Sequence, residues 1–204
     1  MNVLERELLF IISRLRCLTE NQVNRLYNRK KDSKKKVLKR TLRRMCNDYI
    51  LVKFPCNINY RGYKDNSYVY YISGSQLYKG EELVKALIVS DIVVKMKRSN
   101  FEIVRFYRNI NIGYDKYYLF LEYINPIENK RKQLLIDIQL EDKIDFLKYQ
   151  NLEVDMRKST IPFFMKPNIL VITNNTNDYS YLENINKNNI FVIDTSLNSL
   201  LKYL

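Results

Sequence analysis

Eighteen consecutive residues near the amino terminus, NRKKDSKKKVLKRTLRRM (Asn28 to Met45), combine a high positive charge with the apolar spacing of a helix. They include ten Lys or Arg residues and a single acid. Apolar positions in and just after this stretch recur at i, i+4, i+7 and i+11, and are Leu38, Leu42, Met45 and Tyr49. A disordered basic tail would not keep this spacing. We therefore predict a helix, capped by Asp32 or Ser33, with one face in a core and a basic face toward solvent.

Two shorter helices are predicted before this basic helix. Apolar residues at helical spacing indicate a first helix over about Val3 to Cys17. The sequence from Thr19 to Gln22, Thr-Glu-Asn-Gln, has the form of a capping box. In such a box the Thr19 hydroxyl accepts from a backbone N–H three residues on, and Gln22 reaches back. A second helix therefore starts there and ends near Asn28.

Two strands are predicted after the basic helix, over Ile50 to Phe54 and Ser67 to Ile72, because both runs are rich in β-branched and aromatic residues. The polar connection between them contains Arg61, Gly62, Lys64, Asp65 and Asn66. Three helices followed by two strands around a basic loop is the order of a winged helix-turn-helix, a DNA-binding module.

In such a module the third helix enters the major groove, and the wing lies along the backbone or the minor groove. We assign base or near-base contacts to Lys36 and Arg40, since both lie early on the exposed face and Arg can bind guanine bidentately. The other predicted DNA-binding residues lie on this helix, at the turn before it and in the wing: Ser33, Lys34, Lys35, Lys39, Arg43, Arg44, Arg29, Lys30, Lys31, Arg61 and Lys64. A solvated basic helix would share this pattern.

The net charge of +13 is unevenly distributed along the chain. Residues 1–80 contain 18 basic and 6 acidic side chains, whereas residues 81–204 contain 17 and 16. A surplus of this size favours a polyanionic partner, either nucleic acid or an anionic membrane surface. The uneven distribution places the binding surface in the amino-terminal part.

Composition excludes several classes of protein. The apolar run Leu8 to Ile12 is too short for a signal peptide, and no stretch approaches the roughly eighteen apolar residues of a membrane helix. Three cysteines without paired spacing argue against a disulfide framework or a zinc site. The absence of His excludes Ser-His-Asp hydrolases, His-ligated zinc enzymes and His-metal relaxases. We expect a soluble, cytoplasmic protein without membrane contact and without a cofactor.

The rest of the sequence predicts a mixed α/β layer. A helix over Glu81 to Val94 would link the two halves or pair with a second copy. Strand-like runs follow at Phe101–Tyr107, Tyr117–Tyr123, Gln133–Leu140, Ile169–Thr173 and Ile190–Ile193, with helical segments at Lys143–Tyr149 and Ser196–Leu204. We therefore predict an α+β chain, with a winged helix-turn-helix in residues 1–76, a linking helix in 77–98 and a mixed α/β domain in 99–204.

Four stretches carry a resemblance to a known family: VLERELLFIISRLRCLTENQVNRLY, the basic helix, the tyrosine-rich segment ending in YVYYIS, and LLIDIQLEDKIDFLKYQNL. Together they cover most of the chain, which resembles the replication-relaxation proteins of bacterial plasmids and integrative elements. The resemblance implies a degenerate restriction-endonuclease-like core in the second half. It also implies sequence-specific DNA binding in plasmid replication, relaxation or conjugative transfer.

Nuclease cores of that type hold Mg²⁺ through an acid on one strand and an acid-x-Lys pattern on the next. Asp137 lies where the first acid of the second motif is expected, but Gln139 replaces the Lys, and Glu122 could supply the earlier carboxylate. The motif is therefore incomplete, and ordinary polar positions in a structural sheet explain it better. No Tyr is marked out as a nucleophile by surrounding Arg, Lys or acids.

We expect a non-enzymatic protein of a mobile element that binds specific double-stranded DNA, as an accessory or regulator of replication or transfer. The carboxy-terminal domain would form a homodimer or contact other plasmid replication or transfer proteins. Two alternatives remain open: a metal-dependent nuclease or nicking enzyme using Asp137, Glu122 and Gln139, and a chromosomal transcription regulator.

Overall fold

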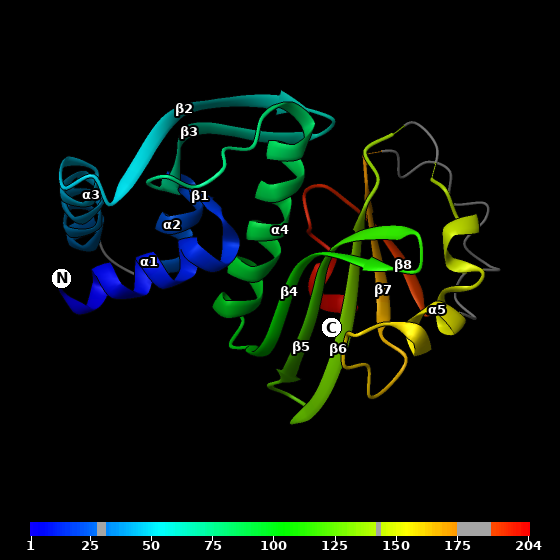
Figure 1. Ribbon diagram of the computed structural model, residues 1–204. Coiled ribbons are helices and arrows are strands. Elements are labelled where there is room, and N and C mark those ends of the chain that lie inside the picture. Colours follow the sequence, from blue (N-terminus) through cyan, green and yellow to red (C-terminus); the bar gives the residue numbers. More distant parts are fainter. Residues whose placement is uncertain (28–31, 142–143, 175–188) are drawn as a thin grey trace. The chain divides into compact units, whose positions relative to one another are not determined.

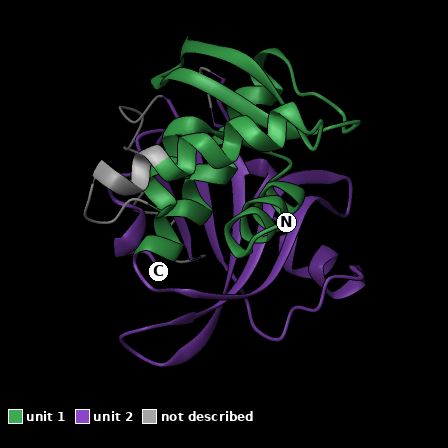
Figure 2. Ribbon diagram, turned by 90° about the vertical axis from the view of Figure 1, so that its left-hand side faces the viewer, with its two compact units in different colours: residues 1–98 green, residues 99–204 purple. Residues whose placement is uncertain are grey.

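A computed structural model describes residues 1–27, 32–141, 144–174 and 189–204, with backbone alone at 32–36. These residues form five α-helices and two β-sheets, which is an α+β fold (Figure 1). The chain divides into two compact units, residues 1–98 and 99–204 (Figure 2). The division follows Arg98, where the sequence predicted the end of the linking helix. Within the described ranges, no helix is both long and apolar enough to cross a bilayer.

The first unit contains four helices and a three-stranded antiparallel sheet in the order β1-β3-β2. In chain order its elements are α1 (Val3–Leu15), β1 (Cys17–Thr19), α2 (Glu20–Tyr27), α3 (Asp32–Asn47), β2 (Leu51–Tyr60), β3 (Tyr63–Ile72) and α4 (Gly80–Arg98).

Capping boxes begin the first two helices. At α1 the Glu5 N–H donates to Asn2 Oδ1 at 2.9 Å, and the Asn2 N–H donates to Glu5 Oε2 at 2.7 Å. Before α2 the Gln22 N–H donates to Thr19 Oγ1 at 3.2 Å, and the Thr19 N–H donates to Gln22 Oε1 at 2.9 Å. The predicted capping box at Thr19 is therefore confirmed. Each box satisfies backbone N–H groups that have no partner within the helix.

The α3 helix buries Leu38, Leu42 and Met45, as its apolar spacing predicts. The prediction that Tyr49 shares this buried face is wrong. Tyr49 lies beyond the end of the helix with a φ of 55°, and 83% of it is exposed. The reversal of the chain direction there leads into β2, so the last apolar position of the periodic pattern belongs to a turn.

The β2–β3 hairpin is longer than the sequence predicts. Its strands are paired from Leu51 with Ile72 to Tyr60 with Tyr63, so most of the expected loop is strand. The turn consists of Arg61 and Gly62 alone, with φ values of 49° and 79°. Positive φ at both positions is the feature of a type I′ turn, whose geometry matches the right-handed twist of the strands.

The α4 helix is buried nearly all round, from Val84 to Met96. Buried polar contacts attach it to the rest of the first unit. Ser90 Oγ donates to the Cys17 carbonyl at 2.9 Å, and Gln22 Nε2 donates to the Leu87 carbonyl at 2.8 Å. The expected linking helix therefore belongs to the core of the first unit.

The second unit is built on a five-stranded sheet in the order β4-β5-β6-β7-β8. Its strands are β4 (Glu102–Ile112), β5 (Asp115–Asn125), β6 (Lys130–Ile138), β7 (Asn168–Thr173) and β8 (Ile190–Asp194). The first three are antiparallel neighbours, whereas β6, β7 and β8 run parallel. The sheet is therefore mixed, as the order of strands and helical segments in the sequence suggests.

The helical segments of the second unit differ from the predictions. The expected helix Lys143–Tyr149 is reduced, within its described part, to one 3-10 turn, η1 (Leu147–Tyr149). An α-helix that the sequence analysis did not predict follows as α5 (Leu152–Lys158). The expected closing helix Ser196–Leu204 is the short turn η4 (Leu200–Lys202). These segments have too few periodic apolar positions to distinguish a turn from a helix.

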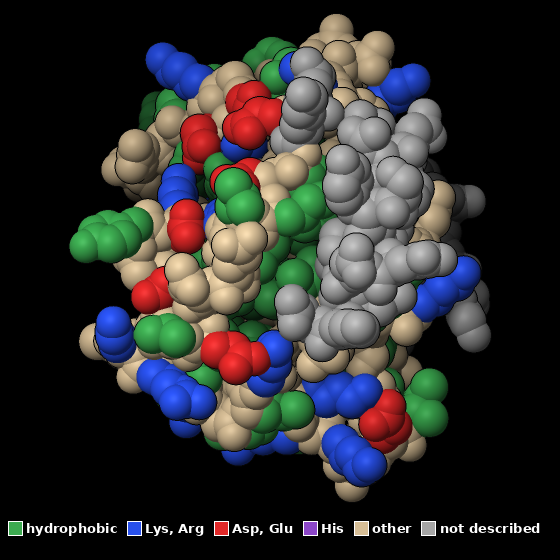
Figure 3. Space-filling model, turned by 90° about the vertical axis from the view of Figure 1, so that its right-hand side faces the viewer, with side chains coloured by type: hydrophobic (Ala, Val, Ile, Leu, Met, Phe, Trp, Pro, Cys, Tyr) green, Lys and Arg blue, Asp and Glu red, His purple; other side chains and the backbone are tan. Residues whose placement is uncertain are grey.

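The core of the second unit lies between the sheet and the segments after β6. It includes Tyr117, Phe120, Leu135, Leu152 and Val171. The face of the molecule in Figure 3 shows acidic and basic side chains intermingled, with hydrophobic side chains among them.

Candidate nucleic-acid interface

The exposed face of α3 is basic. Lys39, Arg40 and Arg43 are exposed, whereas Leu38 and Leu42 are buried. The helix holds the cations in place by anchoring its opposite face, and the Thr41 hydroxyl adds a hydrogen bond of 3.0 Å to the Val37 carbonyl. This arrangement keeps several positive charges on one rigid surface, which suits binding to a line of phosphates.

Arg44 is held by an acid from another helix. Its Nε donates to Glu5 Oε1 at 2.7 Å, and Nη2 contacts the same oxygen. Backbone hydrogen bonding at Asn2 lowers the pKa of Glu5, and Arg44 lowers it further. Arg44 is still 55% exposed, so it can contact an anion, but with part of its charge neutralised.

The outward face of the β2–β3 hairpin is polar and carries no acid. Its exposed residues alternate along both strands and are Lys53, Pro55, Asn57, Asn59, Lys64, Asn66 and Tyr68. The Lys53 ammonium lies 4.7 Å from the centre of the Tyr68 ring, a distance typical of a cation–π contact. These side chains offer hydrogen-bond donors and positive charge, which are the groups that bind the sugar-phosphate backbone.

This hairpin face adjoins α3 at Cys46. Burial raises the pKa of the Cys46 thiol, and the nearby Lys53 ammonium opposes that rise. Lys53 therefore lies close to the carboxy-terminal half of α3. The α3 helix and β2 are in contact, so the hairpin begins beside α3.

The turn of the hairpin is occupied by contacts within the first unit. The Arg61 guanidinium lies 5.9 Å from the Tyr60 ring centre, and the Tyr60 hydroxyl donates to Glu81 Oε2 at 3.0 Å. A hydrogen bond from Lys85 lowers the pKa of Glu81, with further lowering by Tyr60 and Arg61. Of the two predicted wing contacts, Lys64 is thus exposed on the outward face and Arg61 lies near an acid of α4.

Buried Asp65 fixes the hairpin to the helices. Its carboxylate accepts from Thr19 Oγ1 at 2.7 Å, Asn21 Nδ2 at 3.0 Å and Ser67 Oγ at 2.6 Å. Sequence analysis placed Asp65 in a basic loop. Its role was not visible there, because Thr19 and Asn21 lie more than forty positions away in the sequence.

Seven of the predicted DNA-binding residues lack described side chains. Arg29, Lys30 and Lys31 lie outside the described residues, and for Ser33, Lys34, Lys35 and Lys36 the backbone alone is described as part of α3.

The division into units makes the charge distribution sharper than the sequence analysis suggested. Residues 1–98 contain 22 basic and 9 acidic side chains, and residues 99–204 contain 13 of each. The entire net charge of +13 therefore belongs to the first unit. By net charge, a polyanion would be attracted mainly to that unit.

In the second unit, a buried carboxylate is surrounded by donors. Asp137 lies near the end of β6 and is almost inaccessible to solvent. Its Oδ2 accepts from Gln139 Nε2 at 2.9 Å, Lys148 Nζ at 2.9 Å and the Tyr149 hydroxyl at 2.8 Å. Sequence analysis missed Lys148 and Tyr149, although both lie in the quoted segment LLIDIQLEDKIDFLKYQNL.

The partners of Asp137 are themselves fixed. Lys148 Nζ also donates to the Lys116 carbonyl at 2.6 Å and lies 4.3 Å from the Tyr117 ring centre. Burial raises the pKa of Tyr149, and the neighbouring Asp137 raises it further. A tyrosine nucleophile needs the opposite shift, so this environment does not activate Tyr149.

The structure does not bring Glu122 and Asp137 together. Glu122 lies opposite Gln133 in the sheet, and Asp137 is four residues further along β6, about 13 Å at 3.3 Å per residue. Glu122 instead pairs with Arg131 and, at 3.5 Å, with Arg105. Among the described side chains, no group of three Cys, Asp or Glu residues could hold a metal ion.

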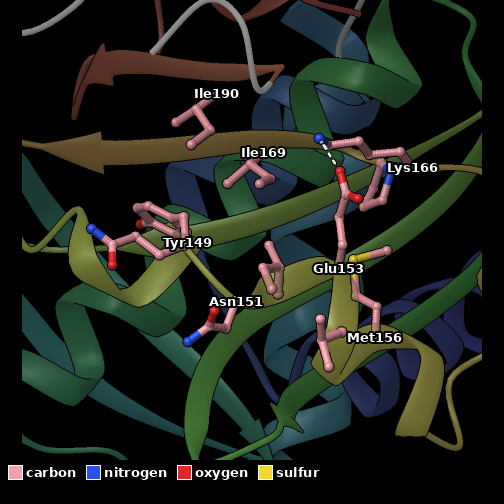
Figure 4. A pocket seen from close by; sticks show the side chains of 11 residues that line it. Tyr149, Asn151, Glu153, Met156, Lys166, Ile169 and Ile190 are labelled. Atoms are coloured by element: carbon pink, nitrogen blue, oxygen red, sulfur yellow. Dashed lines mark hydrogen bonds and ion pairs between the residues drawn. The ribbon is translucent and has the colours of Figure 1, made fainter. Parts of the chain in front are cut away.

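A pocket of about 290 Å³ lies beside α5 (Figure 4). Ile169 and Ile190 from neighbouring strands line it together with Met156, and an ion pair between Glu153 and Lys166 borders it. It contains neither Asp137 nor Glu122.

Comparison of the chain with protein-family models, with curated proteins and with solved structures finds no match.

Proposed function

We propose that this protein binds double-stranded DNA through its first unit, which acts as a winged helix-turn-helix with α3 as its recognition helix. The observation that carries the proposal is the composition of the two α3 faces. Leu38, Leu42 and Met45 are buried, while Lys39, Arg40 and Arg43 are exposed. The order of elements supports the assignment, since a helix pair is followed by a basic helix and an antiparallel hairpin.

The hairpin extends the proposed surface. Its outward Lys53 adds positive charge, and Lys64 continues it toward the hairpin turn, while Asp65 holds the hairpin in a fixed position. In this arrangement Arg40 contacts a base edge, because it lies nearer the start of the helix. Arg43 contacts a phosphate. Service in plasmid replication, relaxation or transfer, and pairing of two copies, remain predictions from the resemblance and the sequence.

Binding assays with single-residue variants test the proposal. A duplex selected from a random library and a scrambled duplex are titrated by fluorescence anisotropy at several salt concentrations. Arg40→Ala is expected to reduce the preference for the selected duplex at least tenfold, since a lost base contact costs about 1–3 kcal/mol. Arg43→Ala is expected to lower the affinity for both duplexes by the same factor.

The matched control is the double variant Arg157→Ala/Lys158→Ala, which removes two exposed cations from α5 in the neutral unit. It should bind both duplexes as the wild type does. The role of α3 would be disproved if both α3 variants bound the two duplexes with wild-type affinity. It would also be disproved if the control variant lost as much affinity as the α3 variants.

One observation favours a nuclease as the second candidate. Lys148 supplies, beside Asp137, the cation that Gln139 does not. Incubating the bound duplex with Mg²⁺ or Mn²⁺ and resolving the products on a gel tests it. Cleavage that disappears in Asp137→Asn, with circular dichroism showing that this variant is folded, would establish this activity, and intact DNA under both metals would rule against it.

A further inference from the structure

One apolar side chain stands on the exposed surface of α3. Val37 is 56% exposed, whereas Leu38, Leu42 and Met45 on the same helix are at most 2% exposed. An exposed valine beside Arg40 contributes nothing to phosphate binding. It also lowers helix propensity slightly, because it is branched at Cβ.

The position of Val37 on the helix matches that of a base-reading residue. It is the sixth residue of α3 and therefore lies in its amino-terminal half, from which recognition helices contact base edges. Arg40, three residues on, lies about 60° away around the axis and about 4.5 Å along it. That rise is close to the step between neighbouring base pairs, so the two side chains can face adjacent bases.

The chemistry of the major groove offers one apolar partner. Each base edge there presents hydrogen-bond donors and acceptors, and thymine alone adds a C5 methyl group. Valine has no donor or acceptor in its side chain, and its branched Cβ leaves little rotamer freedom to lose on binding. A thymine methyl is therefore the feature of DNA that Val37 can recognise.

We propose that Val37 contacts a thymine C5 methyl group in the major groove and makes recognition by α3 depend on that methyl. The inference rests on the proposed function, because it requires α3 to lie in the groove. Burying one methyl-sized group is worth about fourfold in a binding constant. The contact therefore adjusts sequence preference, while the cations provide most of the affinity.

Removing the methyl from the DNA tests this contact. The duplex selected by full-length wild-type protein is prepared once with thymine and once with deoxyuridine at every thymine position, which deletes the methyl and keeps base pairing. Wild type is expected to bind the deoxyuridine duplex about fourfold more weakly for each contacted thymine. Val37→Ala is expected to bind the two duplexes with nearly equal affinity.

Val154→Ala is the matched control, since Val154 is 53% exposed on helix α5 of the second unit. It should keep the wild-type ratio between the two duplexes. Thermal melting should show both alanine variants folded like wild type, because both valines are exposed.

Each remaining outcome is decisive. Equal binding of the two duplexes by wild type, with the preference over scrambled DNA retained, would overturn the methyl contact and leave the proposed function intact. If Val37→Ala bound both duplexes more weakly by the same factor, Val37 would pack against protein or the DNA backbone. That result would also overturn the methyl contact. Absence of any preference over scrambled DNA would refute the proposed function, and the inference with it.

Discussion

Asp137 accepts hydrogen bonds from three side chains in the second unit. Its carboxylate is buried, and Lys148, with only 13% of its side chain exposed, depends on it for a counterion. We expect Asp137→Ala to lower the free energy of unfolding by about 3–5 kcal/mol, because it leaves a buried cation unpaired. Urea denaturation followed by circular dichroism measures the change.

The control for this prediction is Glu141→Ala, which removes an exposed acid close in sequence and should change stability by less than about 0.5 kcal/mol. An Asp137→Ala variant that unfolds at the wild-type urea concentration would show that the carboxylate is not needed for the fold. It would strengthen the case for a chemical role.

Glu5 gives a prediction with a defined pH dependence. Its pKa is lowered in the folded protein, so the ionised form stabilises the fold above the ordinary carboxyl pKa, and this stability is lost as the pH falls through the folded value. Glu5→Gln should therefore melt below wild type at pH 7, and the difference should shrink as the pH falls from about 4.3, the ordinary glutamate pKa, through the lowered folded value. A constant difference across this range would mean that hydrogen bonding, not charge, is responsible.

The β2–β3 hairpin reverses its direction at a turn of two residues. Arg61 and Gly62 both adopt positive φ, which glycine tolerates and β-branched residues do not. Gly62→Val should lower the unfolding free energy by about 1–3 kcal/mol. Arg61→Asn should leave it unchanged or raise it, since asparagine favours the first position of such a turn. Thermal unfolding of the two variants measures these changes. A Gly62→Val protein as stable as wild type would contradict the turn geometry.

Local signals in the sequence predicted the helices of the first unit well. The capping box at Thr19 and the spacing of Leu38, Leu42 and Met45 depend on neighbours within one or two turns, so both were readable. The length of the hairpin could not be predicted, because the polar residues from Asn57 to Asn66 lack strand propensity. Asp65 among them is fixed by Thr19 and Asn21, which are distant in the sequence.

The candidate site was partly readable for the same reason. The exposed cations of α3 follow from helical spacing alone. The contact of Arg44 with Glu5, and that of Lys148 with Asp137, join residues on different elements. No periodic pattern in one segment encodes such a pair.

For the whole molecule, the placement of the net charge predicts a strong salt dependence of binding. All of the +13 lies in residues 1–98, so we expect the first unit to supply most phosphate contacts. The logarithm of the DNA-binding constant should fall linearly with the logarithm of salt concentration, by about 0.9 for each phosphate neutralised. Arg43→Ala should reduce this slope by about one. Fluorescence anisotropy titrations of both proteins at about 50 to 200 mM salt provide the comparison. An unchanged slope would show that Arg43 does not contact a phosphate.

Pro55 has a consequence for the behaviour of the protein at high concentration. In the described sheet β2 pairs with β3 alone, so this ten-residue strand lies at the edge of the sheet. Long exposed edges invite the strands of other molecules to add to them, which leads to aggregation. Proline in the middle of β2 has no N–H to offer, and Lys53 nearby adds charge repulsion between copies. We therefore expect Pro55 and Lys53 to limit the addition of strands from other molecules to this edge.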